Sequence, residues 1–149
     1  MLPSTKTINK KTQLVIQEEK TGCAIASVAA VVGTTYAEVK ARANSIGIFA
    51  TDDKLYSETN YVRRLLKEYD TRAAPDETPF RSWETLPELA LLAIKHHLEG
   101  GRPFWHWVVF SRENGSPVIL DSAAYLKNNI RRDFYRIKPR WYIKIISRK

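Results

Sequence analysis

The feature that most constrains the fold is an Asn-Gly pair, at positions 114–115, between two apolar runs. The first run, Pro103–Ser111 (PFWHWVVFS), is aromatic and β-branched, and Pro117–Asp121 (PVILD) continues the pattern after the pair. Asn-Gly favours the tight turn of a β-hairpin. The segment therefore predicts two antiparallel strands. Asp133–Ile137 and Trp141–Ile146 are candidates for later strands.

The first half of the chain carries helix signals instead. Cys23–Val32 (CAIASVAAVV) is small and apolar on nearly all sides, which predicts a buried helix that ends at Gly33. Helices followed by an antiparallel sheet predict an α+β fold. Three more helices are expected: one from a Thr35/Glu38 capping box to about Ser45, closed by Gly47; Glu58–Tyr69 with Ser57 as its cap; and Pro87–Leu98, followed by Gly100 and Gly101.

Length and composition limit the kind of protein. The 149 residues fit a single domain, 1–149, with a core that needs no disulfide or metal. The N-terminal lysines are not followed by an apolar segment, so no classical signal peptide is predicted. We expect a cytoplasmic protein, with secretion by a signal-independent route as the alternative. A single cysteine excludes an intrachain disulfide and a Cys-rich zinc site, and no cofactor or metal is expected.

The basic charge is concentrated at the C-terminal end. The formal net charge is +8, and residues 127–149 alone carry it, with nine basic side chains against one acid, Asp133. Basic residues alternate with aromatic ones there, a pattern typical of nucleic-acid surfaces and equally suited to an acidic protein partner. A solvated strand face is the commoner explanation of such a segment.

Cys23 is the candidate nucleophile. It stands at the predicted start of the apolar helix, where the helix dipole favours a thiolate. The competing interpretation is a buried structural cysteine, since cysteine is among the most buried residue types.

Three polar residues complete a possible site around this cysteine. His106 lies inside an apolar strand, so its ring nitrogens need partners, either in the core or as the base for a thiol. Asp121 ends the return strand of the hairpin, close enough in the predicted pairing to orient His106. Gln17 precedes Cys23 by six residues and can supply an amide to an oxyanion beside the Cys23 N–H.

These residues and their order resemble the papain-like cysteine peptidases, and most closely the bacteriocin leader-processing peptidases and their stand-alone relatives. The segments that carry the likeness are QEEKTGCAIASVAAVVGTTYAEV, GGRPFWHWVVF and VILDSA. The resemblance implies a papain-like fold in which the central helix begins at the nucleophile and packs on a C-terminal antiparallel sheet. It implies Cys23 as nucleophile, His106 as base, Asp121 as the orienting acid and Gln17 in the oxyanion hole.

Two classes of function remain open at this point. A Cys-His pair supports peptide hydrolysis, and it equally supports deamidation or acyl transfer on a protein side chain. The other class is a non-catalytic binding module that uses the basic segment 127–149 for nucleic acid or an acidic partner. His96 and His97, at the end of the helix predicted over Pro87–Leu98, are interpreted as surface residues.

Overall fold

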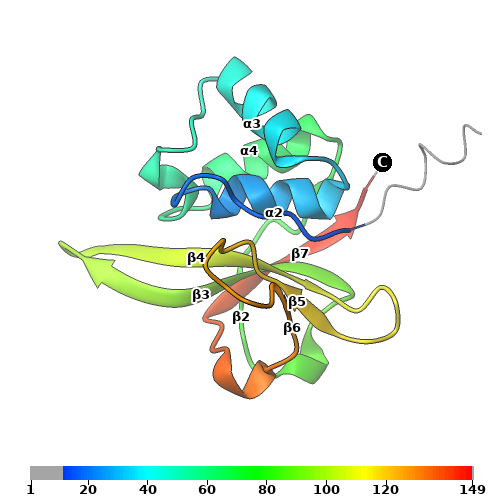
Figure 1. The fold of residues 1–149 in the computed structure, drawn as a ribbon. Helices are drawn as coiled ribbons and strands as arrows, with labels where there is room; N and C mark the ends of the chain where they lie inside the picture. Colours follow the sequence, from blue (N-terminus) through cyan, green and yellow to red (C-terminus); the bar gives the residue numbers. More distant parts are fainter. Residues whose placement is uncertain (1–11, 149) are drawn as a thin grey trace, which may run out of the picture.

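The computed structural model describes residues 12–148 as one antiparallel sheet with helices packed against it (Figure 1). The sheet has the strand order β1-β7-β3-β4-β5-β6, with β2 paired to β7. This arrangement confirms the α+β prediction. The helices are α2 (Cys23–Val32), α3 (Tyr36–Ser45) and α4 (Asn60–Glu68), and the strands are β1 (Arg72–Ala73), β2 (Thr78–Pro79), β3 (Leu89–Glu99), β4 (Arg102–Ser111), β5 (Val118–Leu120), β6 (Ile130–Arg131) and β7 (Trp141–Ser147).

Helix α2 lies against the sheet at the centre of the main core. Its ten residues are all buried, as the apolar sequence predicts, and its bounds agree with the prediction. Gly33 ends it in the left-handed conformation, at φ 76°. Helices α3 and α4 cover α2 on the same side of the sheet (Figure 1). None of the helices in residues 12–148 is long and apolar enough to cross a membrane.

The other predicted helix boundaries are partly right. Thr35 caps α3 by accepting a hydrogen bond from the Glu38 N–H at 3.1 Å, which is half of the predicted capping box. Helix α4 begins at Asn60, after the predicted start, and Thr59 rather than Ser57 is its N-cap residue.

The helix predicted over Pro87–Leu98 is wrong, because this segment forms the central strand β3. Leu, Ala and Lys favour a helix, and an apolar run without alternation does not distinguish a buried helix from a strand covered on both faces. Here a core cluster covers each of the two faces of the sheet. Alternate residues of β3 enter them: Leu89, Leu91 and Ala93 face the helices, while Ala90, Leu92 and Ile94 enter a second cluster.

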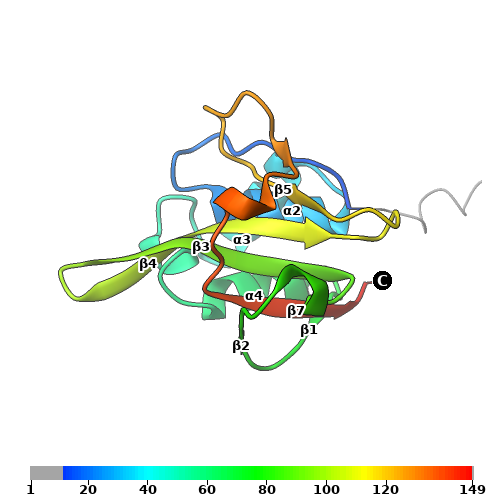
Figure 2. The same cartoon turned by 90° about the horizontal axis from the view of Figure 1, so that it is seen from below.

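The second cluster is closed by short segments rather than by helices. The turns Trp83–Thr85 and Phe134–Arg136 lie over this face of the sheet, which Figure 2 shows from below. Trp83 and Phe134 pack against the cluster. The second of these turns is a 3-10 helix, so the strand predicted over Asp133–Ile137 is wrong. The strand predicted at Trp141–Ile146 is confirmed as β7.

The predicted hairpin of β4 and β5 is confirmed, but its pairing is short. Val109 lies opposite Leu120 and Phe110 opposite Ile119, while Gly115 provides the positive φ that the turn needs. Strand β4 continues well before this pairing begins. The half that carries His106 therefore has one edge not paired with β5.

Candidate active site

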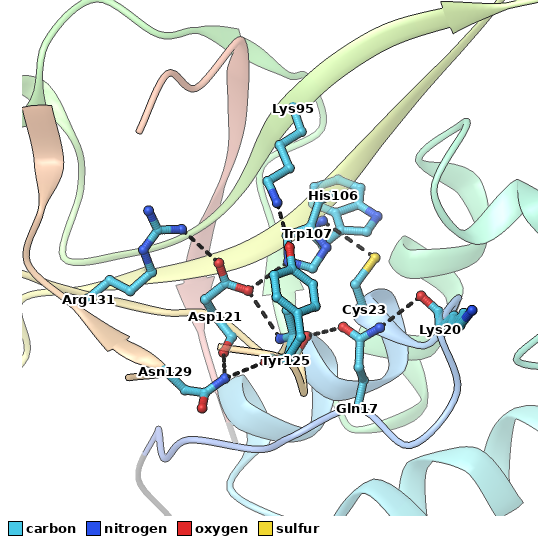
Figure 3. Close-up of polar contacts among 12 residues, drawn as sticks. Gln17, Lys20, Cys23, Lys95, His106, Trp107, Asp121, Tyr125, Asn129 and Arg131 are labelled. Atoms are coloured by element: carbon cyan, nitrogen blue, oxygen red, sulfur yellow. Dashed lines mark hydrogen bonds and ion pairs between the residues drawn. The ribbon is translucent and has the colours of Figure 1, made fainter. Parts of the chain in front are cut away.

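The open edge of β4 is where helix α2 begins. The N–H of Trp105 donates to the Tyr56 carbonyl oxygen at 3.0 Å. Two residues on, the N–H of Trp107 donates to the Cys23 Sγ at 3.5 Å. The thiol therefore takes the place that a neighbouring strand would occupy, and it points toward the segment that holds His106 and Trp107 (Figure 3). Cys23 is buried, with an exposed fraction of only 4%.

The N-terminus of α2 leaves donors available beside the sulfur. Its N-cap residue is Gly22, which provides no side-chain cap, and the first turn contains no acidic residue. Within residues 12–148, no group accepts a hydrogen bond from the N–H of Cys23. Unsatisfied N–H groups at a helix N-terminus favour negative charge nearby, either a thiolate or an oxyanion.

Gly22 is required by a close contact with Tyr36. A Cβ at position 22 would lie 2.1 Å from the Tyr36 hydroxyl oxygen and 3.2 Å from the Glu19 carbonyl oxygen. Tyr36 is itself buried and hydrogen-bonds the Glu19 carboxylate, so it has little room to move. Any larger residue at position 22 must displace the turn that leads into Cys23.

We therefore expect Gly22→Ala to lower the free energy of unfolding by about 1–3 kcal/mol, the usual cost of overpacking. Combining it with Tyr36→Phe removes the closest contact, so the cost of Gly22→Ala should be smaller in that background. Urea unfolding of the four proteins in this double-mutant cycle measures the coupling. Equal costs in both backgrounds would show that Tyr36 does not impose the glycine.

His106 and Asp121 form a hydrogen-bonded pair in which Asp121 is buried and His106 is partly buried. The His106 Nε2 lies 2.7 Å from the Asp121 Oδ1, with side-chain exposures of 17% and 1%. The hairpin produces this contact because Leu120, next to Asp121, is opposite Val109 on the strand that carries His106. The two residues therefore lie close together, as the predicted hairpin pairing indicates.

The surroundings of His106 favour its charged form. Burial by itself opposes a charged imidazole, but the hydrogen bond to Asp121 and the neighbouring Cys23 side chain outweigh it and raise the pKa of His106 to about 9. For Asp121, burial is likewise outweighed, chiefly by His106, and the pKa of this carboxyl is lowered. At neutral pH the site therefore holds an imidazolium beside a carboxylate.

Because the pKa of His106 is higher in the folded protein than in the unfolded chain, folding stability decreases as the pH rises. Because the folded value of about 9 exceeds the ordinary 6.5, the contribution is complete below pH 6.5 and is lost as pH rises through 9. We expect urea unfolding to show this loss, of at most about 3 kcal/mol, between these limits. His106→Asn should flatten the dependence. His97→Asn should change it little, because the Lys95 backbone and Glu99 also raise the pKa of His97 but at a solvent-exposed site. An equal slope in His106→Asn would assign the effect to other groups.

Arg131 is a member of the site that the sequence analysis placed only in the basic segment. Its Nη1 donates to the Asp121 Oδ2 at 2.9 Å, and its Nε and Nη2 bind Asp133. The Ala123 N–H donates to the Asp121 Oδ1 at 3.2 Å. Asp121 is thus held on both oxygens. No local sequence signal points to Arg131, because only the pairing of β6 with β5, just before Asp121, brings it to the site.

Gln17 lies close to the site. We expected its amide to be free for an oxyanion, but the amide is already hydrogen-bonded. Its Nε2 donates to the carbonyl oxygens of Glu19 and Lys20, at 3.0 and 2.8 Å, which occupies both hydrogens. Its Oε1 accepts from the Ser122 hydroxyl at 2.7 Å. In this geometry Gln17 ties the turn before Cys23 to the residue after Asp121 (Figure 3), and it directs no free N–H at an oxyanion.

A cavity of about 380 Å³ opens beside His106. Tyr56, Phe104 and Trp105 provide aromatic walls, and polar and charged side chains of the β3–β4 hairpin line the remainder together with Asp53. Across β4, the Lys95 Nζ donates to the Tyr125 hydroxyl at 2.7 Å (Figure 3). This bond joins the strand before β4 to the loop after β5, so it restricts one approach to the imidazole.

The two remaining histidines lie on strand β3 rather than at a helix end. His96 stacks on Trp105, with ring centroids 6.3 Å apart, and His97 pairs with Glu99 at 2.7 Å. Residues 12–148 contain no cluster of three or more His, Cys, Asp or Glu side chains that could hold a metal ion.

Comparison with models of known protein families gives no match for this chain, and neither does comparison with curated protein sequences. The function is therefore inferred from the geometry of the site.

Proposed function

We propose that this protein is a papain-like cysteine hydrolase that cleaves a peptide or protein amide bond. The observation that supports this most directly is the junction of three elements: the start of α2 with Cys23, the open edge of β4 with His106, and the end of β5 with Asp121. A charged imidazole beside a thiol favours the thiolate, which is the nucleophilic form of cysteine.

The proposed reaction begins with attack of the Cys23 thiolate on the carbonyl carbon of the substrate. The backbone N–H of Cys23, at the N-terminus of α2, stabilises the oxyanion that forms. His106 donates its proton to the departing amine, and a thioester with Cys23 remains. Water, deprotonated by the neutral His106, hydrolyses the thioester, and the released thiolate regains its imidazolium partner.

Asp121 and Gln17 act as positioning residues in this proposal. Asp121 fixes the ring of His106 through Nε2, which leaves Nδ1 for the thiol and the leaving group. Gln17 fixes the turn before Cys23 relative to Ser122, so the nucleophile and the orienting acid keep their spacing. This role replaces the oxyanion-hole role that the resemblance implies.

The experiment that tests the function is digestion of a proteome-derived peptide library, with new termini identified by mass spectrometry. We expect new termini with the wild-type protein and none with Cys23→Ala. Ammonia release without new termini would assign the same site to side-chain deamidation. Transfer of an acyl group between peptides would assign it to acyl transfer. If Cys23→Ala and wild type give identical peptides in every assay, the hydrolase proposal is wrong.

A further inference from the structure

A second cavity, of about 460 Å³, lies between β3 and the connection that leads to β7. Five of its lining residues are basic and none is acidic. Ile94 and Ile137, both members of the second core cluster, form its apolar base. The basic side chains are those of Lys95, Arg131, Arg136, Lys138 and Arg140.

Three of these cations form no salt bridge within residues 12–148: Arg136, Lys138 and Arg140. Arg131, in contrast, binds two aspartates. Of the three, Arg136 is near enough to Asp133 to add to the effect of Arg131 in lowering the pKa of that carboxyl. The effect of this charge is visible on His96, which also lines the cavity: burial, and next the charge of Arg140, lower its pKa. A concave surface with several uncompensated cations attracts anionic groups.

The backbone that carries these cations is anchored and is not a loose tail. Ile137 is buried in the second cluster. The N–H of Arg140 donates to the Ala93 carbonyl oxygen at 2.8 Å, and its own carbonyl oxygen accepts from the Phe80 N–H at 3.1 Å. The opposite wall is formed by the part of β3 after Ile94. There the pairing with β4 shifts its register, and Lys95 adopts a φ of 54°. Such bulges redirect side chains and are frequent beside active sites.

The cavity adjoins the candidate active site. Lys95 lines both this cavity and the one beside His106, and Ile94 at its base is the pairing partner of His106 in the sheet. Arg131 lines the cavity and also binds Asp121, the partner of His106. A group bound in the cavity therefore lies next to the residues that orient the imidazole. Because Lys95 lines both cavities, a peptide bound beside His106 has this cavity next to it.

We propose that this cavity is a subsite for an acidic side chain of the peptide substrate. The inference rests on the proposed function and gives it a substrate class: peptides with Asp or Glu near the scissile bond. The carboxylate is recognised by Arg136, Lys138 and Arg140, while Arg131 remains on Asp121. Charge-assisted hydrogen bonds of this kind are stronger than those between neutral groups.

Cleavage of matched peptides tests this specificity. Peptides with Glu near the scissile bond should be cleaved at least about tenfold more efficiently, in kcat/KM, than the same peptides with Gln. The triple replacement Arg136→Gln, Lys138→Gln and Arg140→Gln should abolish this preference and spare the Gln peptides. A control with the same change of charge, Lys67→Gln, Lys127→Gln and Lys144→Gln, should retain it. Equal rates for Glu and Gln peptides would overturn the subsite.

Binding to the Cys23→Ala protein separates this inference from the hydrolase proposal. The probe is a fluorescent peptide with three consecutive glutamates, followed by anisotropy, beside its glutamine counterpart and a single-stranded oligonucleotide. Tighter binding of the glutamate peptide, lost in the cavity triple variant, supports the subsite even if no hydrolysis is found. Equal binding of both peptides, or cavity-dependent binding of the oligonucleotide alone, contradicts it.

Discussion

Replacing Cys23 by serine is expected to reduce hydrolysis of a peptide substrate by about 10⁴-fold or more. The proposed mechanism needs a thiolate as nucleophile, beside His106, whose pKa is raised to about 9, and the Cys23 Sγ accepts the Trp107 N–H. A serine hydroxyl stays protonated beside an imidazolium and is a far poorer nucleophile there.

The same substitution should leave the fold nearly unchanged. The serine side chain has the same shape as the cysteine side chain and is slightly smaller. Its hydroxyl oxygen can accept the hydrogen bond from the Trp107 N–H. We expect the midpoint of thermal unfolding to stay close to that of the wild type, so lost activity is not lost structure. Full activity in Cys23→Ser with an intact fold would show that the cysteine is not the nucleophile.

Replacing Asp121 by asparagine is the second large effect, with an expected fall of about 10²–10⁴-fold in kcat/KM. The two carboxylate oxygens accept from His106 and from Arg131. An amide has one acceptor oxygen and one NH₂ group, so it cannot satisfy both donors. Either Arg131 loses its partner or the imidazole is driven to the wrong tautomer.

The pH–rate profile distinguishes this role from a merely structural one. Without the carboxylate charge, the pKa of His106 should fall from about 9 toward its ordinary value, and the alkaline limb of kcat/KM should move with it. Asp133→Asn is the matched control, because it removes the other partner of Arg131 and leaves His106 untouched. The same alkaline limb in Asp121→Asn as in the wild type would exclude Asp121 as the residue that orients His106.

The sequence predicts the elements that carry the site better than those that support it. Cys23–Val32 and the hairpin of β4 and β5 carry strong local signals: a small apolar run ended by glycine, and an Asn-Gly turn between β-branched runs. Strand β3 lacks such a signal, because burial on both faces removes the alternation that identifies a strand. The residue pattern also does not predict the irregular pairing of β3 at Lys95, which helps to form the basic cavity between β3 and the connection to β7.

Partners of the site residues are harder to predict than the residues themselves. The sequence places Gln17 at a suitable spacing before Cys23, yet the hydrogen bonds of its amide depend on how the turn of Glu19 and Lys20 closes. Arg131 is one of nine basic residues in its segment, and only the pairing of β6 with β5 brings it to Asp121. Such contacts arise from tertiary structure and have no local signal.

The rate at which iodoacetamide alkylates Cys23 is the sharpest test of its activation by His106, because the chain has a single cysteine and labelling reports on it alone. We predict that at pH 7 the folded protein reacts about tenfold or more faster than the same chain in urea, because activation by His106 outweighs the burial of Cys23. His106→Asn should remove this advantage. If the folded protein reacts more slowly than the unfolded chain, and His106→Asn leaves the rate unchanged, Cys23 is a buried structural cysteine and the account is contradicted.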